Sequence, residues 1–188
     1  MIKIIDNFLN DTEASIVEKS VTEVHWFLTL EEASVSPYKY LTMKDSNTKE
    51  YLQFCHNLLD HRGELVSPNY KYLIDFIKNK LNKTTPVTEF LRMKINLQTQ
   101  CSFSNEDFYN TPHLDRLGDN ENYFNAIYYV NECDGDTYFF NKEKEGYSIV
   151  DKISPKKGRL ILFSGDTYHA GRHPIKALKR IVINCNFR

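Results

Sequence analysis

Residues 159–187 read RLILFSGDTYHAGRHPIKALKRIVINCNF, two strand-like runs separated by a tract of turn residues. The first run, Arg159–Ser164, is mostly apolar, whereas the second, Arg180–Phe187, alternates in character. Successive side chains of a strand point to opposite faces, so the second run is expected to present one apolar and one largely polar face. The residues expected on the largely polar face are Arg180, Val182, Asn184 and Asn186.

The strand-rich texture of this stretch begins near Pro86 and continues to residue 188. Short runs rich in β-branched and aromatic residues are separated by turn residues such as Asp134-Gly135. Many short strands with no helical pattern between them predict a β-sandwich or barrel for residues 86–188. The other strand-like runs are Val87–Thr99, Tyr123–Asn131, Thr137–Asn141 and Tyr147–Ile153.

Residues 1–85 are expected to form a helical support layer packed on the outside of this barrel. Asn10 precedes apolar residues at near-helical spacing, which is typical of a capped helix. Tyr70–Leu81 has a clear helical pattern, Tyr51–Leu59 is a shorter helix candidate, and Ser34–Asn47 is expected to be a loop or irregular hairpin. No repeat or linker divides the 188 residues, so a single domain, mainly β with supporting helices (α+β), is predicted.

Composition and charge narrow the classes of function. The formal net charge is -1 and the isoelectric point about 6.6, so the chain has no overall basic field for nucleic acid. No apolar run is long enough to span a bilayer, and no membrane partner is expected. The cysteines are scattered without a C-x-x-C pair, which favours a reducing cytoplasm. They are Cys55, Cys101, Cys133 and Cys185.

Three residues form a candidate metal site. His113 and Asp115 lie two positions apart, so in an extended segment their side chains project to the same side. His169 follows the apolar run Leu160–Phe163 and is placed to provide a third ligand. Two imidazoles and one carboxylate leave coordination positions open, which is the arrangement of non-haem Fe(II) oxygenases, whereas a structural zinc site commonly has four protein ligands.

Arg180 adds to this prediction because its expected position is inside the barrel. A buried guanidinium is costly unless an anion meets it. A dicarboxylate that chelated the metal by its 2-oxo acid end would extend its far carboxylate to Arg180 and form a bidentate pair. The alternative is an exposed arginine at the start of an edge strand.

The sequence resembles the 2-oxoglutarate and Fe(II)-dependent dioxygenases, in particular their prolyl 4-hydroxylase-like branch. The resemblance covers residues 91–188 and implies a double-stranded β-helix, a cupin-like jelly roll with iron inside its mouth. The matching stretches are Pro112-His113-Leu114-Asp115, Ala126–Asn131, Asp134–Thr137, Pro155–Phe163, His169-Ala170-Gly171, Pro174-Ile175 and Arg180.

The resemblance also implies roles for single positions. The three metal-site residues would bind iron, and Arg180 would bind the distal carboxylate of 2-oxoglutarate. Tyr129 matches a position that hydrogen-bonds the same carboxylate, although it is equally read as a core aromatic. Asn184 is a further candidate for the co-substrate pocket. The tract before Arg180 is slightly longer than in common members, which leaves Arg172 and Lys179 as alternative anion partners.

The activity that this resemblance implies is hydroxylation of an unidentified substrate, with release of succinate and CO2. Fe(II), 2-oxoglutarate and O2 would be required, and ascorbate would be stimulatory. A prolyl residue in a peptide or protein is the first expected substrate. Alternatives are a non-catalytic cupin-like metal- or ligand-binding protein and a metal-dependent isomerase or hydrolase. The polar segment Gln100–Thr111 is expected to be either a lid or a surface loop.

Overall fold

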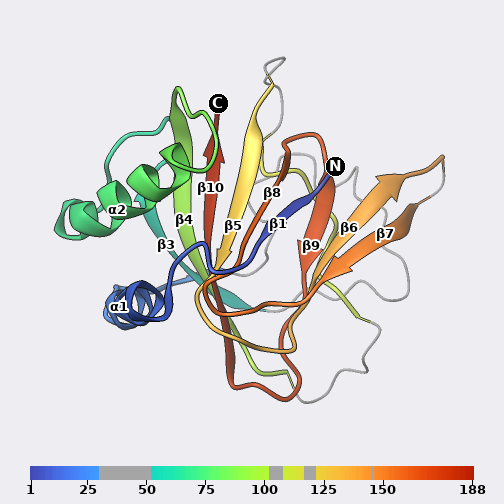
Figure 1. Ribbon diagram of the computed structural model, residues 1–188. Coiled ribbons are helices and arrows are strands. Elements are labelled where there is room, and N and C mark those ends of the chain that lie inside the picture. The colour runs from blue at the N-terminus through green and yellow to red at the C-terminus, as the bar shows by residue number, and fades with distance from the viewer. Residues whose placement is uncertain (30–51, 102–107, 117–121, 145) are drawn as a thin grey trace.

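The computed structural model of the chain describes residues 1–29, 52–101, 108–116, 122–144 and 146–188. Within these residues, two antiparallel sheets face each other (Figure 1). In spatial order, the larger sheet contains β1 (Lys3–Ile5), β8 (Leu160–Ser164), β5 (Phe124–Tyr129), β10 (Lys179–Phe187), β4 (Phe90–Thr99), β3 (Gln53–Leu59) and β2 (Phe27–Thr29). The smaller sheet contains β7 (Tyr147–Ile153), β6 (Thr137–Lys142) and β9 (Tyr168–Gly171). This architecture confirms the predicted jelly-roll fold.

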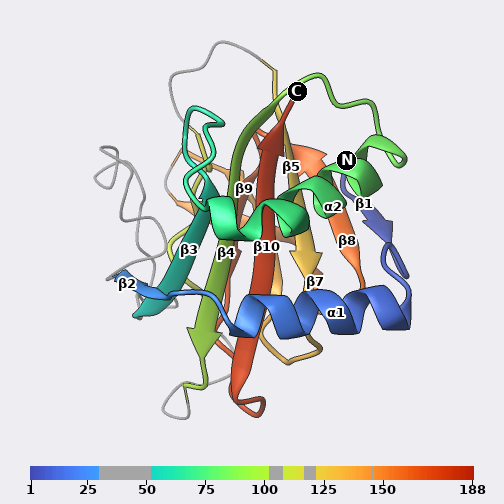
Figure 2. The same ribbon diagram turned by 90° about the vertical axis from the view of Figure 1, so that its left-hand side faces the viewer.

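Two helices cover the outer face of the larger sheet, as Figure 2 shows. Helix α1 (Asp11–Thr22) begins at Asn10, whose side chain accepts a hydrogen bond from Glu13 N while Glu13 Oε2 accepts one from Asn10 N. Helix α2 (Lys71–Asn82) follows a 3-10 turn at Pro68–Tyr70. Both helices of the described residues are twelve residues long, and neither is long and apolar enough to cross a membrane.

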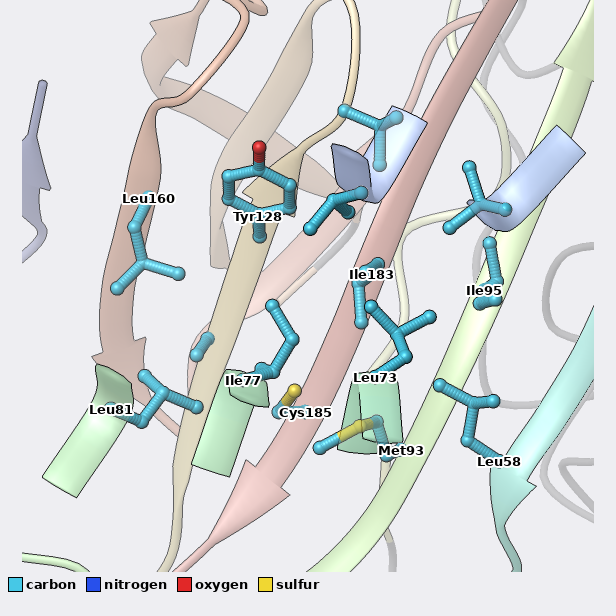
Figure 3. Close-up of a cluster of buried hydrophobic side chains, with 14 of the residues drawn as sticks. Leu58, Leu73, Ile77, Leu81, Met93, Ile95, Tyr128, Leu160, Ile183 and Cys185 are labelled. Carbon is cyan, nitrogen blue, oxygen red and sulfur yellow. The ribbon is translucent and has the colours of Figure 1, made fainter. Parts of the chain in front are cut away.

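The main hydrophobic core lies between these helices and the larger sheet (Figure 3). Leu73, Ile77 and Leu81 of α2 are almost completely buried against the sheet. The sheet presents Met93 and Ile95 from β4, Ile183 and Cys185 from β10, and Tyr128 from β5. Burial of such side chains contributes roughly 1.5–3 kcal/mol each, so this layer stabilises the scaffold on which the inner face is built.

The inner face of the larger sheet is polar where β4 and β10 pair. Directly opposite residues in an antiparallel pair point to the same face. Arg180, Asn184 and Asn186 therefore share the inner face with their β4 partners, as the alternation of 180–187 predicted. The paired residues are Arg180 with Gln98, Val182 with Asn96, Asn184 with Lys94 and Asn186 with Arg92.

The structure corrects one prediction in the first part of the chain. Tyr51–Leu59 was expected to be a helix, but Gln53–Leu59 forms strand β3, which pairs with β4. A short apolar run does not distinguish a helix from a strand by its periodicity, and the open edge of β4 decides in favour of the strand. Strands β1 and β2 also belong to this part, so it is not purely helical. The expected loop at Ser34–Asn47 lies outside the described residues.

Candidate metal centre

His113, Asp115 and His169 converge at the mouth between the two sheets. Each offers a ligand atom, and these atoms lie within 4.8 Å of one another. The Nε2 atom of His113 is 3.9 Å from Asp115 Oδ1, and that of His169 is 3.7 Å from Asp115 Oδ2. Within the part of the chain that the structure describes, no other group of three histidine, cysteine or acidic side chains comes together in this way.

Backbone pairing brings the two histidines together. His113 N donates to His169 O at 3.0 Å, and His169 N donates to His113 O at 3.1 Å. The segment before His113 continues this pairing, since Asn110 N donates to Gly171 O. As a result the segment that carries His113 extends the smaller sheet beyond β9, and the two imidazole rings lie 4.8 Å apart.

Both imidazole rings are held in the same way. The Nδ1 atom of His113 lies 3.0 Å from the carbonyl oxygen of Thr111, and that of His169 lies 3.2 Å from the carbonyl oxygen of Thr167. A carbonyl oxygen only accepts hydrogen bonds, so in each neutral ring Nδ1 carries the proton and Nε2 keeps its lone pair. The lone pairs are thus available on the side of Asp115, where a metal ion would bind.

Asp115 is oriented by two asparagines of β10. Asn184 Nδ2 donates to Asp115 Oδ1 at 3.2 Å and to Oδ2 at 3.0 Å, and Asn186 Nδ2 donates to Oδ2 at 3.1 Å. Burial raises the pKa of Asp115, but the charges of His169, His113 and Arg92 and the hydrogen bond from Asn184 together hold it well below its ordinary value. Asp115 is therefore a carboxylate at neutral pH.

The donor atoms fit a divalent iron ion. Two imidazole nitrogens, which would bind a metal in their neutral form, and one carboxylate oxygen lie on one side of a common point, which leaves other coordination positions for ligands that are not from the protein. All four cysteines are free thiols, and none belongs to the cluster. The rings of Phe163 and Phe139 pack against His169, with centroids 4.9 and 6.5 Å away, and give the centre an apolar wall.

Arg180 is buried deeper in the barrel, on the same face of β10 as Asn184. Its Nε donates to Gly135 O at 2.8 Å, its Nη1 to Gln98 Oε1 at 3.0 Å, and its Nη2 to Thr137 Oγ1 at 2.8 Å. Arg180 is only 3 % exposed, and no described carboxylate forms an ion pair with it. A cation in that position is expected to meet an anion.

Tyr129 lies beside Arg180. The guanidinium carbon of Arg180 is 5.9 Å from the centre of the Tyr129 ring, and the Tyr129 hydroxyl donates to Thr137 Oγ1 at 2.7 Å. Burial raises the pKa of Tyr129 to about 12, although the charge of Arg180 opposes that shift. The phenol is protonated at neutral pH, so Tyr129 and Arg180 both offer donors near Thr137.

The two alternative anion partners have other surroundings. Arg172 lies 3.6 Å from Asp136 and donates to the carbonyl oxygen of Asp134. Lys179 precedes Arg180 on β10 and points to the opposite face. These positions favour Arg180 over Arg172 and Lys179.

The turn Asp134-Gly135 explains how Arg180 is held. Asp134 accepts hydrogen bonds from three successive backbone N–H groups, at residues 175–177, and so holds the loop that leads into β10. A Cβ atom at Gly135 would overlap the carbonyl oxygen of Arg172 and lie 2.9 Å from Arg180 Cδ. Glycine at position 135 therefore lets the loop and the Arg180 side chain come close to the turn.

The role of two asparagines in holding Asp115 was not predictable from the sequence. Asn184 was predicted for the co-substrate pocket, whereas its amide nitrogen donates to Asp115, and no role was predicted for Asn186, whose amide nitrogen also donates to Asp115. The alternation of β10 placed both residues on the face of Arg180, but no local pattern linked them to a residue sixty-nine or seventy-one positions away. A place for Asn184 in the co-substrate pocket stays a prediction, and half of Gln100–Thr111, the expected lid or loop, lies outside the described residues.

The fold and the site together define a jelly-roll protein with two histidines and one carboxylate at an open metal centre, the class of non-haem Fe(II) oxygenases. Residues 97–188, which include all of the predicted site residues, match the family model of the 2OG-Fe(II) oxygenase superfamily. The match covers just under half of the 188 residues. The match confirms a 2-oxoglutarate-dependent dioxygenase that uses Fe(II), 2-oxoglutarate and O2.

Solved structures show the same fold at low sequence identity. A 2OG-Fe(II) oxygenase family oxidoreductase from Burkholderia pseudomallei aligns with a TM-score of 0.70 and 13% identity, over 99% of this chain and 84% of that one. A prolyl hydroxylase from Trichoplax adhaerens, in complex with a hypoxia inducible factor peptide fragment, has a TM-score of 0.61 and 16% identity over 99% and 83%. HygX from Streptomyces hygroscopicus, with nickel and 2-oxoglutarate bound, has a TM-score of 0.59 and 11% identity over 99% and 82%. No curated protein sequence matches this chain.

Proposed function

We propose that this chain hydroxylates a substrate at an iron centre held by His113, Asp115 and His169. The reaction converts R–H, 2-oxoglutarate and O2 into R–OH, succinate and CO2, which balances all atoms. The observation that carries the proposal is the convergence of two imidazole Nε2 atoms and a carboxylate within 4.8 Å, with both Nδ1 atoms already facing backbone carbonyl groups. Bound Fe(II) would supply the positions at which 2-oxoglutarate and O2 react.

Arg180 and Tyr129 form the proposed binding site for the distal carboxylate of 2-oxoglutarate. The guanidinium is buried, is held by Gln98 and Thr137, and forms no ion pair with a described carboxylate. The Tyr129 hydroxyl adds a neutral donor beside it. Charge-assisted hydrogen bonds, such as those between Arg180 and a carboxylate, are about twice as strong as neutral ones. This binding site would therefore fix one end of the co-substrate.

The surrounding residues would keep the centre in its reactive geometry. Asn184 and Asn186 orient the carboxylate of Asp115, and the carbonyl groups of Thr111 and Thr167 fix the imidazole tautomers. Phenylalanine rings beside His169 exclude water from one side of the centre. The protein thus orients the ligands, and the oxidation itself belongs to the metal and co-substrate.

A prolyl residue in a peptide or protein is the first substrate class to test. The fold similarity to the Trichoplax prolyl hydroxylase, which was solved with a peptide fragment, supports this choice. It does so through the fold alone, so the substrate must be identified by experiment.

The test is succinate formation by the purified protein with Fe(II), ascorbate and 2-oxoglutarate. We expect slow succinate release without substrate, faster release with the true substrate, and a gain of one oxygen atom in the product by mass spectrometry. His113→Ala should abolish succinate formation and leave a folded protein by circular dichroism. A wild-type protein that binds iron and 2-oxoglutarate but never forms succinate would instead be a non-catalytic cupin-like binding protein.

A further inference from the structure

Arg92 is a second cation beside the candidate metal centre, on the inner face of β4. In the pairing of β4 with β10 it lies opposite Asn186, whose amide donates to Asp115. The charge of Arg92 is also among the causes that lower the pKa of Asp115. The neighbouring inner-face residue of β4 is Lys94, which is 9 % exposed and lies opposite Asn184. Arg92 and Lys94 therefore place two cationic side chains on the side of the centre near Asp115.

Arg92 and Arg180 lie at different ends of this inner face. The β4 residue opposite Arg180 is Gln98, six positions from Arg92. Six residues of a strand span about 20 Å. Asp115 contacts Asn184 and Asn186, the residues opposite Lys94 and Arg92, so the metal centre lies toward the Arg92 end. A co-substrate held by Arg180 would thus leave Arg92 available to a second molecule.

Arg92 forms no ion pair with a described residue, although its charge acts on the nearby Asp115 carboxylate. Among the residues that the structure describes, three other arginines lie within 4.0 Å of a carboxylate: Arg159 near Asp6, Arg172 near Asp136 and Arg188 near Glu89. Arg92 is half-buried, and no described side chain forms an ion pair or hydrogen bond with it. A partly buried guanidinium without a directly paired anion is unfavourable, so an anionic ligand group would be stabilised there.

Asn184 and Asn186 add hydrogen-bond acceptors to the same place. A carboxylate only accepts hydrogen bonds, so each amide must turn its nitrogen toward Asp115 and its oxygen away from it. Both Oδ1 atoms are buried, and neither accepts a hydrogen bond from a described residue. A buried acceptor without a donor costs about 1–3 kcal/mol, and a ligand with N–H groups would remove that cost.

We propose that the substrate is a free α-amino or imino acid, with its carboxylate on Arg92 and its charged amine on an Oδ1 atom of the asparagine pair Asn184 and Asn186. This inference rests on the proposed function and narrows its substrate. A zwitterion offers an anion and a charged N–H donor only a few bonds apart, matching one cation beside two acceptors. An internal peptide residue offers no anion of its own and would leave Arg92 unpaired. Free proline has both the carboxylate and the charged amine that this binding site requires. It is also the free form of the prolyl residue proposed above as the first substrate class.

The first experiment measures binding without turnover. The protein, loaded with Ni(II) and saturated with 2-oxoglutarate, is titrated by calorimetry with L-proline and the other protein amino acids. Each ligand that binds is compared with its carboxamide, which lacks the anion, and with its N-acetyl derivative, which lacks the charged amine. We expect at least one amino acid to bind and each derivative to bind roughly tenfold or more weakly. Absence of binding by every amino acid, or equal binding of acid and amide, overturns the proposal.

Variants then test whether Arg92 causes the preference for the acid. Arg92→Gln should remove most of the difference between acid and amide, whereas Arg92→Lys should keep part of it because the charge remains. The matched control is Lys83→Gln, which removes an exposed positive charge at the end of α2 and should keep the full difference. Circular dichroism checks the fold of each variant. If Arg92→Gln does not fold, Arg92→Lys provides the test. An undiminished preference for the acid over the amide in Arg92→Lys would exclude a bidentate pair at Arg92.

Turnover separates this inference from the proposed function. With Fe(II), a true amino acid substrate should increase succinate formation and gain one oxygen atom. If the protein forms succinate but no amino acid increases the rate or binds in the calorimeter, the amino acid site is overturned. The proposed oxygenase activity is then unaffected. Stimulation by a prolyl peptide but by no free amino acid identifies a peptide substrate instead. No succinate under any condition overturns the proposed function itself.

Discussion

Asn184 donates from one amide nitrogen to both carboxylate oxygens of Asp115, at 3.2 and 3.0 Å. The two residues are sixty-nine positions apart in the chain, and Asn184 lies on β10 while Asp115 lies in the segment before β5. This contact fixes the plane of the carboxylate relative to His113 and His169. The proposed iron centre therefore depends on a residue that would not itself bind the metal.

The first prediction is that Asn184→Ala weakens metal binding by about 10- to 100-fold, because Asp115 loses the donor that orients it. Asn184→Asp should weaken apo-protein stability as well, because a second carboxylate would face Asp115 in a buried place. Titration with Co(II), followed by its visible absorption, measures the affinity. Asn141→Ala, an exposed asparagine on β6, is the control and should bind Co(II) normally. Unchanged affinity in Asn184→Ala would remove the orienting role.

Arg180→Ala should raise the KM for 2-oxoglutarate about tenfold or more, since a charge-assisted bidentate pair is lost. The kcat at saturating 2-oxoglutarate should change less. Lys179→Ala is the matched control, because that side chain points to the other face of β10. Steady-state succinate formation measures both constants. A larger effect from Lys179→Ala than from Arg180→Ala would show that Arg180 does not bind the distal carboxylate.

Tyr129→Phe should raise the KM for 2-oxoglutarate by roughly tenfold or less through loss of one donor. Because the pKa of Tyr129 is raised to about 12, its phenol stays protonated well above neutral pH. The ratio of variant to wild-type KM should therefore be constant between about pH 7 and 9. Tyr128→Phe removes a hydroxyl from the outer core on the opposite face of β5 and should leave the KM unchanged. Equal effects of both variants would argue against a role for Tyr129.

Gly135→Ala should destabilise the protein by about 1–3 kcal/mol, because the added Cβ overlaps the Arg172 carbonyl oxygen. The same overlap displaces Arg180, so the KM for 2-oxoglutarate should rise as well. Thermal unfolding and steady-state kinetics measure the two effects. A variant with wild-type melting temperature and KM would show that the loop moves away without cost.

Much of the fold was predictable because local patterns carried it. The capping position of Asn10 and the helical spacing of Tyr70–Leu81 predicted both described helices to within a few residues. The alternation of Arg180–Phe187 predicted which of its residues face the inside. The segment Gln53–Leu59 was misread as part of a helix, because its strand conformation depends on pairing with β4.

The residues of the candidate site differed in how far the sequence alone could predict them. The spacing of His113 and Asp115 identified two of the three clustered residues, and His169 followed from the apolar strand before it. Their task as iron ligands stays a prediction. Arg180, Arg172 and Lys179 were all predicted as candidate partners of the distal carboxylate of 2-oxoglutarate. Only contacts between the two sheets favour Arg180. Arg172 lies near Asp136, while Arg180 has neutral hydrogen-bond partners and no anion among the described residues.

The amino-acid sequence by itself predicted the strand-rich character of residues 86–188, the placement of His113 and Asp115 on one side of an extended segment, and the polar face of β10. These features depend on neighbours one to four positions apart, where backbone geometry sets the direction of each side chain. Only the tertiary structure decided that Asn184 holds Asp115 and that Arg92 lies beside the same centre. Those relationships depend on the register between strands that are distant in the chain, which hydrophobic packing over the whole sheet selects.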